Sequence, residues 1–283
     1  MRLDDDGDQS NVEDRRGQSG LGGAPLRLGI GGTIVVLVLS VVFKKDFFAL
    51  VGSDSTGSRP VPGNSAPPAD PGRIKAEKEL EKLAVAAFND TQRVWGGRQG
   101  AGYRPAKLVL FWDEVRSGCG AAAAEMGPFY CPADEKVYLD LGFYRELASR
   151  FRAPGQFAQA YVVAHEMGHH MQHLLGTEHK VREAQRLHPE QRNALSVRME
   201  LQADCLAGVW GHSAKARGLL DPGDLEGGLN AAAAIGDDRI QKRATGRVSP
   251  ESFTHGSSAQ RVQWFRRGFE SGDPHSCDTF TAR

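Results

Sequence analysis

The sequence has no excess of charge of either sign, because 35 lysines and arginines balance 35 aspartates and glutamates. Proteins that bind nucleic acid through its phosphates carry a basic excess. We therefore expect no nucleic-acid partner. The sequence also lacks internal repeats, and its 283 residues leave room for one sizeable domain with appendages.

Long apolar runs are almost absent, and the one exception is LGIGGTIVVLVLSVVF at residues 28–43. This run is slightly short for a membrane span, although FFALVG just beyond it could extend the span if Lys44 and Lys45 snorkel. The run lacks a small-residue cleavage site at its end, and the segment before it is acidic, unlike a signal peptide. We therefore expect a single transmembrane helix at residues 28–43.

The segments around this run differ in composition from the rest of the chain. Residues 1–27 are polar and carry no apolar periodicity, which predicts a disordered N-terminus. Residues 44–73 are rich in Ser, Gly and Pro, which is typical of a flexible tether. We expect the folded domain to occupy residues 74–283.

Cysteine is scarce, and all four cysteines follow the apolar run. An even number suits two disulfides in an oxidising compartment, although four buried thiols are the alternative. We predict that Cys119–Cys131 closes a short loop and that Cys205–Cys277 ties a helix to the C-terminal tail. Basic residues are equally frequent on both sides of the run, so their count does not indicate its orientation in the membrane. The cysteines do, because disulfides form in an oxidising compartment. We expect a cytoplasmic N-terminus and an extracytoplasmic domain.

The apolar patterns of the domain predict an α+β fold with a small mixed sheet. Residues 118–131 are expected to form a loop because Gly and Pro bound them. A strand is expected at 107–115, and the segment 136–147 is expected to begin as a strand and turn into a helix. Helices are expected at 75–95, 156–176, 189–218 and 257–272, with broken helix at 224–244.

The stretch HEMGHH at residues 165–170 carries the chemistry of a zinc site. On a helix, His165 and His169 lie one turn apart and can both reach one zinc ion. Glu166 projects about 100° round from His165, where a carboxylate can take a proton from water beside the metal. A solvated helix face is the alternative. Apolar residues on both sides argue against it, because buried imidazoles without partners are costly.

A catalytic zinc ion needs a third protein ligand and an open position for water. The pattern H-E-x-x-H-x-x-G-x-x-H fails here, because Gln172 and Leu175 occupy its last two defined positions. His173 remains possible, but three ligands in line on one helix fit a tetrahedral site poorly. Glu200 on the next predicted helix is the preferred third ligand, and we expect one zinc ion per chain.

Asp204 follows Glu200 by four residues and so shares its face of the helix. A carboxylate there can accept a hydrogen bond from the N–H group of a ligand histidine that does not bind the metal. An acidic helix surface is the ordinary alternative. The surrounding sequence MELQADCLAGVW is apolar, however, and two buried carboxylates need cations or a metal.

These residues resemble those of the gluzincin metallopeptidases, and more closely those of the bacterial putative neutral zinc metallopeptidase family. The likeness is carried by NVEDRRG (11–17), GPFYCPADEKVYLDL (127–141), HEMGHHMQHLLG (165–176), LQADCLAGVW (201–210) and SFTHGSSAQRVQWFRRGFESGD (252–273). It implies a zincin-like metallopeptidase domain that cleaves a peptide or protein substrate. With the apolar run, it implies a place at the bacterial cell membrane.

A more distant likeness is to membrane-associated CAAX-type and stress-induced peptidases, which share the E-x-x-A-D pattern. They also share a Thr-His pair followed six residues later by Arg, here Thr254, His255 and Arg261. This likeness implies that His255 donates a hydrogen bond to the oxyanion. Arg261 would support His255 only if the loop bends, because helical geometry would put them about 600° apart.

Together, these features predict a membrane-anchored, zinc-dependent endopeptidase with Glu166 as its general base. The alternative is a non-catalytic zinc-fold envelope protein that binds partners. Glu166 favours the enzyme, because a structural zinc site needs no base and prefers four protein ligands. VYLDL at 137–141 is expected to be the edge strand that binds an extended peptide, or else a plain core strand.

Overall fold

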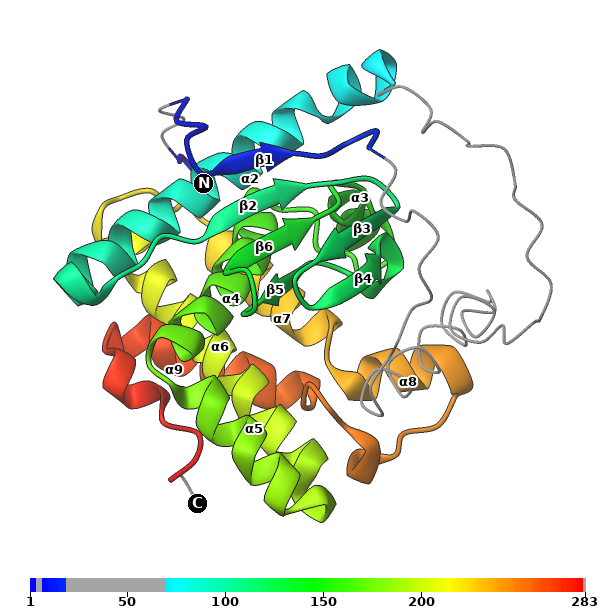
Figure 1. The fold of residues 1–283 in the computed structure, drawn as a ribbon, viewed down its shortest axis with the longest axis vertical. Coiled ribbons are helices and arrows are strands. Elements are labelled where there is room, and N and C mark those ends of the chain that lie inside the picture. Colours follow the sequence, from blue (N-terminus) through cyan, green and yellow to red (C-terminus); the bar gives the residue numbers. More distant parts are fainter. Residues whose placement is uncertain (4–6, 19–69, 282–283) are drawn as a thin grey trace.

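The computed structural model describes residues 1–3, 7–18 and 70–281 (Figure 1). The predicted span at 28–43, and the predicted tether up to residue 69, lie outside the described residues. Within the described part of the chain, no helix is both long and apolar enough to cross a membrane.

A four-stranded mixed sheet lies against the helices, with the strand order β1-β2-β6-β5. The three strands β1, β2 and β6 are parallel, and β5 runs antiparallel to β6. A separate hairpin of two antiparallel strands, β3 and β4, accompanies this sheet. The strands are β1 (Val12–Asp14), β2 (Lys107–Leu110), β3 (Glu114–Ser117), β4 (Gly120–Ala123), β5 (Phe129–Cys131) and β6 (Lys136–Leu139).

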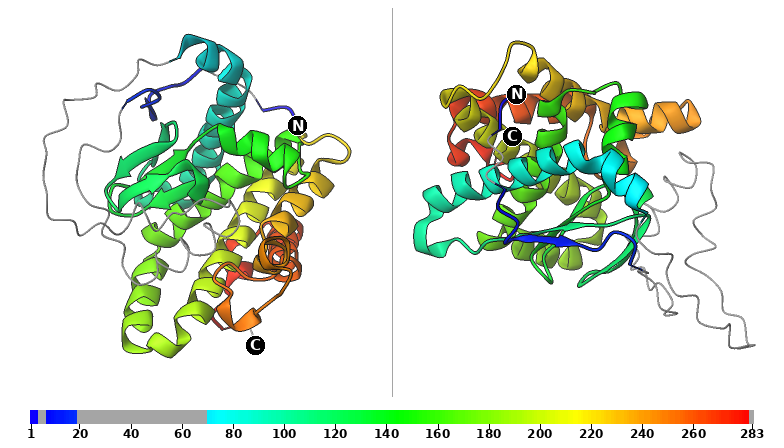
Figure 2. Two further views of the ribbon diagram at one scale, coloured as in Figure 1. Left: turned by 90° about the vertical axis from the view of Figure 1, so that its right-hand side faces the viewer. Right: turned by 90° about the horizontal axis from the view of Figure 1, so that it is seen from above.

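Helices make up most of the remaining described chain, so the predicted α+β class and small mixed sheet are confirmed. In Figure 1, α5, α6 and α9 lie below the sheet, while α2 runs along a face of the sheet, as the view from above in Figure 2 shows. The helices are α2 (Pro71–Gln99), α3 (Gly142–Ser149), α4 (Gln156–Leu174), α5 (Thr177–Leu187), α6 (Arg192–Ala216), α7 (Asp224–Ala234), α8 (Asp237–Thr245) and α9 (Ser258–Ser271).

The two faces of the sheet bury different sets of apolar residues, because side chains alternate along a strand. One set packs with the helices α2 and α4 and contains Leu108, Leu110, Val137 and Leu139. The other set packs with the β3–β4 hairpin and contains Val109, Phe111, Cys131 and Tyr138. The sheet is thus covered on both faces, which suits its parallel strands.

The predicted disorder of residues 1–27 is wrong for residues 7–18. Strand β1 pairs with β2 in parallel register, with Val12 opposite Leu108. The Nζ atom of Lys136 lies 2.8 Å from Oε1 of Glu13. This segment has no apolar periodicity of its own, and its order comes from partners far away in the sequence, such as Leu108 and Lys136.

This pairing also corrects the predicted membrane topology. Residues on both sides of the 28–43 run belong to one folded domain, since β1 and β2 are hydrogen-bonded neighbours in the same sheet. A single crossing at 28–43 would place these two strands on opposite sides of a membrane. β1 and β2 must lie on the same side of a membrane, so a cytoplasmic N-terminus cannot be combined with an extracytoplasmic domain.

Several expected boundaries also differ. The first helix begins at Pro71, ahead of the predicted start of the domain, because Asp70 caps it by accepting a hydrogen bond from the N–H of Gly72. Residues 118–131, predicted as loop, contain β4 and β5. Pairing with β3 decides β4, because its Gly and Ala residues do not favour a strand, and pairing with β6 decides β5, which has only three residues. The helix α5 was not predicted.

The expected edge strand is also wrong. VYLDL overlaps β6, which has β2 on one side and β5 on the other. Within the described residues, β5 is the strand at that end of the sheet. The sequence did not reveal this arrangement. A short turn joins β5 to β6, and β5 pairs with the edge of β6 that β2 leaves free.

Both predicted disulfides are present. Cys119 is bonded to Cys131 at the end of β5, and Cys205 in α6 is bonded to Cys277 near the C-terminus. The described residues contain no free cysteine. The alternative of four reduced thiols is therefore not seen.

Candidate metal centre

The helix α4 crosses α6 at very short range, and this contact brings the two halves of the site together. A Cβ atom on Gly168 would lie 2.9 Å from the carbonyl oxygen of Ala203. No larger residue fits at Gly168 without moving the two helices apart. Gly168 lies next to His169, and Ala203 lies between Glu200 and Asp204. The helix crossing therefore brings the histidines of α4 close to the two carboxylates of α6.

The three predicted ligands converge on one point. Oε2 of Glu200 lies 3.2 Å from Nε2 of His165, and Oε1 of Glu200 lies 3.5 Å from Nε2 of His169. One donor atom from each residue lies within 4.8 Å of the others. Two imidazole nitrogens and one carboxylate suit Zn²⁺, and three ligands leave a position open for water.

Each histidine is oriented by a hydrogen bond on its other nitrogen. Nδ1 of His165 lies 3.0 Å from Oδ1 of Asp204, and Nδ1 of His169 lies 2.8 Å from Oε1 of Gln172. Partners of this kind fix the tautomer and turn Nε2 towards the metal position. Asp204 was predicted for this role. Gln172 was missed, although its place three residues after His169 on the same helix was a usable signal.

His165 lies between two carboxylates, Asp204 and Glu200. Burial lowers the pKa of His165, but the hydrogen bonds to the two carboxylates outweigh it and raise the pKa to about 10. A cation bound at Nε2 takes the place of the proton on that nitrogen. Metal binding at this centre is therefore coupled to proton release.

Asp204 is completely buried and has further partners. Its two oxygens lie 2.8 Å from Nε and 2.9 Å from Nη2 of Arg261, and the hydroxyl of Tyr161 also donates to it. Burial would raise the pKa of Asp204, but the charges of Arg261 and His165 outweigh it and lower the pKa. The carboxylate therefore stays ionised in the interior. Tyr161 was not predicted, although it lies one turn before His165.

Arg261 reaches Asp204 because α9 packs closely on α6. A Cβ atom on Gly208 would lie 2.1 Å from the carbonyl oxygen of Phe265, and one on Gly268 would lie 1.9 Å from that of Cys205. These glycines bring the two backbones into contact. Arg261 then enters the interior from the first turn of α9, with only 2% of its surface exposed.

Glu166 lies beside the three ligands without joining them. Its carboxylate receives no hydrogen bond from the described residues, and only 7% of the residue is exposed. Burial raises the pKa of Glu166, and the charge of Glu200 adds to this, against the opposing influence of His165 and His169. A raised pKa makes this carboxylate a stronger base, as a group that must accept and return a proton requires.

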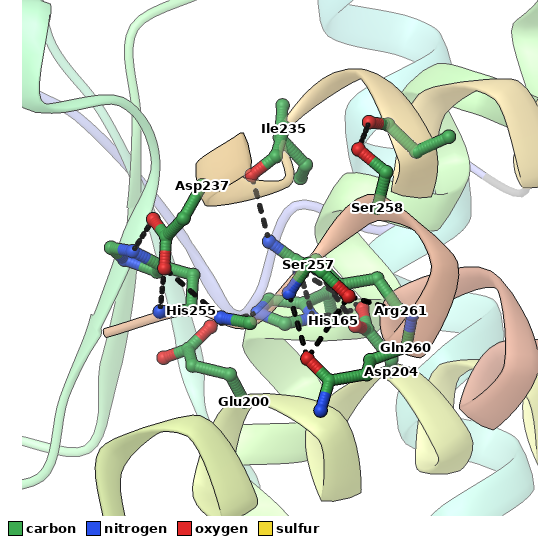
Figure 3. A network of polar contacts seen from close by, with 12 residues as sticks. His165, Glu200, Asp204, Ile235, Asp237, His255, Ser257, Ser258, Gln260 and Arg261 are labelled. Atoms are coloured by element: carbon green, nitrogen blue, oxygen red, sulfur yellow. Dashed lines mark hydrogen bonds and ion pairs between the residues drawn. The ribbon is translucent and has the colours of Figure 1, made fainter. Parts of the chain in front are cut away.

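His255 is held by Asp237 rather than by Arg261, which corrects the expected support. Oδ2 of Asp237 accepts hydrogen bonds from the backbone N–H groups of Thr254, His255 and Gly256, at 2.7, 2.6 and 3.0 Å. Oδ1 of Asp237 lies 3.3 Å from Nδ1 of His255. Figure 3 shows Asp237, His255 and Glu200 on one side of His165, with Asp204 and Arg261 on the other.

The electrostatics of His255 depend on the same acids. Partial desolvation in the cavity lowers the pKa of His255, whose side chain is still 43% exposed, but the hydrogen bond to Asp237 and the charge of Glu200 outweigh this and raise the pKa. Asp237 was not identified from the sequence. Its position at the start of α8, with Asp238 beside it, looks like an ordinary acidic first turn of a helix.

One cavity of about 860 Å³ joins these residues. Glu166 and His255 line it together with the three candidate ligands. His173, the rival third ligand, has other partners, because its ring nitrogens lie 3.0 Å from Glu178 and 3.4 Å from Glu135. The structure therefore places Glu200, and not His173, among the candidate ligands.

Comparisons with known proteins agree with this geometry. Residues 1–280 match the family described as "Putative neutral zinc metallopeptidase". The chain is 48% identical to "Uncharacterized protein YpfJ" of Escherichia coli (strain K12) over 289 aligned positions, which cover 99% of each chain. It is 43% identical to "Uncharacterized protein Rv2575" of Mycobacterium tuberculosis over 218 positions, which cover 73% of each. No solved structure matches the chain.

Proposed function

Because the chain belongs to the putative neutral zinc metallopeptidase family, we propose that it hydrolyses peptide bonds with one zinc ion held by His165, His169 and Glu200. The observation that carries this proposal is the arrangement around Glu200. Its carboxylate meets both imidazoles within 3.5 Å, while Glu166 stands beside them without a hydrogen-bond partner among the described residues.

The chain's own residues divide the work of hydrolysis. Bound zinc supplies Lewis-acid activation of water and of the scissile carbonyl. Glu166 takes the proton from the attacking water and delivers it to the leaving amine. His255, held by Asp237, donates a hydrogen bond to the oxygen on which negative charge develops. Asp204 and Gln172 keep the ligand imidazoles in the required tautomer.

The cavity supports a peptide or protein as the substrate. Besides the candidate ligands, residues of β5, α3, α5 and α8 line it, and it offers about 860 Å³ of space. A volume of this size holds several residues of an extended chain. We also infer that the domain works in an oxidising, extracytoplasmic compartment, and the two disulfides support this placement.

The proposal is tested with the full-length chain and a complex mixture of peptides. Zinc content is measured first, and cleavage products are then identified by mass spectrometry with and without a chelator. Chelator-sensitive cleavage that disappears in Glu166→Gln is the expected result. A zinc-loaded protein that cleaves nothing would favour the non-catalytic zinc-fold protein.

A further inference from the structure

The HEMGHH stretch contains more histidine than the metal centre uses, and the next histidine has a defined place. His170 is completely buried. Its Nε2 lies 2.7 Å from the carbonyl oxygen of Arg104, and its Nδ1 lies 2.9 Å from the hydroxyl of Tyr130. A carbonyl only accepts, so Nε2 carries the proton and Nδ1 accepts the hydrogen bond from Tyr130. Both nitrogens of His170 are thus engaged away from the metal.

His173 lies three residues further along the same face of α4. Its Nε2 lies 3.4 Å from Oε1 of Glu135, which belongs to the turn between β5 and β6. The same carboxylate oxygen is 2.6 Å from Nη2 of Arg104. The catalytic helix therefore contacts the β5–β6 hairpin at two points, one on the strand and one on the turn. We call these four residues the hairpin clamp: His170, Tyr130, His173 and Glu135.

Strand β5 borders the candidate active site. One of its edges pairs with β6, and no other strand of the described chain lies beside its second edge. On such an edge strand, alternate residues turn their N–H and C=O groups outwards. Phe129 and Tyr130 line the cavity that also contains His165 and His169. The free edge of β5 is therefore available to an extended chain passing the metal centre.

Other contacts hold β5 to the far face of the sheet rather than to α4. Phe129 stacks on Tyr138 with ring centroids 4.7 Å apart, and Cys131 is bonded to Cys119 of the β3–β4 hairpin. These contacts keep β5 in the sheet, and the sheet packs on α4 through apolar residues such as Val137 and Leu139 of β6. The Tyr130–His170 hydrogen bond adds a directional contact between β5 itself and α4, and His170 lies on the same helix as the ligands His165 and His169.

We propose that His170 and His173 are positioning residues, which hold the free edge of β5 beside the zinc ligands as the edge along which an extended peptide binds. This inference rests on the proposed function. Ligand positions His165 and His169 face the metal, while the clamp positions face the strand. One helix thus aligns the two parts of the site, and its rigidity keeps them aligned.

The decisive variant is Tyr130→Phe, which removes one hydroxyl and no carbon atom. Losing one hydrogen bond that positions substrate should raise KM about 3- to 10-fold. His170→Gln should raise KM at least as much. In both variants kcat should stay within about twofold, and zinc content should not change. This split between KM and kcat separates positioning from a loss of stability, which lowers the amount of active protein and leaves KM alone.

Matched controls come from the same chain. Tyr144→Phe removes a buried hydroxyl that has no hydrogen-bond partner among the described residues. His212→Gln removes an imidazole whose Nδ1 lies 2.8 Å from the carbonyl oxygen of Phe269, between α6 and α9. Both should leave KM unchanged. If Tyr130→Phe and His170→Gln also leave KM unchanged, the clamp does not position substrate.

A second measurement does not depend on activity. Amide hydrogen exchange in the full-length protein should speed up about 3- to 10-fold at Phe129 and Cys131 in His170→Gln, with α6 and α9 unaffected. If the wild-type protein cleaves no peptide, the proposed function fails, and exchange still decides whether the clamp holds β5. Unchanged exchange in β5 would overturn the clamp itself, whatever the activity.

Discussion

Nδ1 of His165 lies 3.0 Å from Oδ1 of Asp204, and this contact joins a candidate zinc ligand to the interior of the protein. The same carboxylate accepts two hydrogen bonds from Arg261. One row of side chains thus runs from α4 through α6 to α9. The orientation of the imidazole therefore depends on the packing of three helices, and the predictions below test this dependence and the residues around it.

The first prediction separates a ligand from its supporting carboxylate. Glu200→Ala should abolish tight zinc binding, because it removes one of three ligands. Asp204→Ala should weaken zinc binding about 10- to 100-fold, since it only frees the imidazole of His165. Titration against a competing chelator measures both. If Glu200→Ala binds zinc as the wild type does, the third ligand lies elsewhere, and His173 becomes the residue to test.

Asp204→Ala needs a control for folding, because it leaves the buried guanidinium of Arg261 without its carboxylate. Losing one partner of a buried ion pair costs about 3–5 kcal/mol of stability. The double variant Asp204→Ala/Arg261→Met removes both charges and should recover part of that stability. Its zinc affinity should remain as low as that of Asp204→Ala, because the imidazole still lacks its acceptor.

The second prediction concerns the general base. Glu166→Gln keeps the shape of the side chain but cannot accept a proton, so it should bind one zinc ion per chain and lose hydrolysis. Metal analysis and peptide cleavage on the same sample provide the test. Wild-type cleavage by Glu166→Gln would mean that another group takes the proton.

The third prediction concerns His255 and its support. His255→Ala should lower kcat about 10²- to 10³-fold, the usual cost of losing one oxyanion donor, with zinc content and KM nearly unchanged. Asp237→Asn should lower kcat less, because the imidazole remains but is held loosely. Steady-state kinetics with zinc analysis distinguishes the outcomes. A loss of zinc in His255→Ala would make it a ligand, and a normal kcat would make it a bystander.

The fourth prediction is a dependence of stability on pH. Asp90 is buried and accepts hydrogen bonds from Nε1 of Trp210 at 2.8 Å and from Nη1 of Arg217 at 2.6 Å. Burial raises the pKa of Asp90, but these partners outweigh it and lower the pKa. A lowered folded-state pKa stabilises the protein above the ordinary aspartate pKa of about 3.9, and this stability is lost as the pH falls through the folded value.

Asp90→Asn should therefore cost about 2 kcal/mol of unfolding free energy at neutral pH, the range for hydrogen bonds to a charged group. The difference from the wild type should shrink below about pH 4, because the carboxylate takes up its proton in the unfolded chain there while it is still ionised in the folded protein. Urea unfolding of both proteins at several pH values measures this. A difference that is the same at every pH would show that the charge of Asp90 is not involved.

The fifth prediction ranks the two disulfides. Cys205 and Cys277 are separated by 72 residues, and Cys119 and Cys131 by 12. By loop closure alone, removing Cys205–Cys277 should lower the free energy of unfolding by about 4 kcal/mol, and removing Cys119–Cys131 by about 3 kcal/mol. Paired Cys→Ala variants in denaturant unfolding give both values, and reduced wild-type protein is the control. The opposite order would mean that native packing, and not chain entropy, dominates.

The residues whose partners lie on their own helix could be predicted from the sequence. His165 and His169 share a face because they are four residues apart, and the same rule pairs Glu200 with Asp204. The apolar sequence around both pairs indicated burial, and buried polar groups need partners. The disulfide pairing followed from where the cysteines lie along the chain.

Other features required the tertiary structure. Asp237 contacts His255 across a loop, and Arg261 reaches Asp204 because Gly208 and Gly268 let two helices touch. Periodicity tells which face of a helix is apolar, but it does not tell which helix that face will meet. The sequence determined which side chains could bind zinc, and the packing of α4, α6 and α9 decided how those side chains are held.

The N-terminal strand and the edge of the sheet illustrate the same limit. Residues 12–14 have no pattern of their own, and their order comes from hydrogen bonds to β2, which are made only when the whole domain closes. A strand next to another in sequence can lie inside or outside it, and β5 lies outside β6. Whether a short segment forms a strand depends on the strands beside it, because an isolated strand has no partner for its backbone N–H and C=O groups except water.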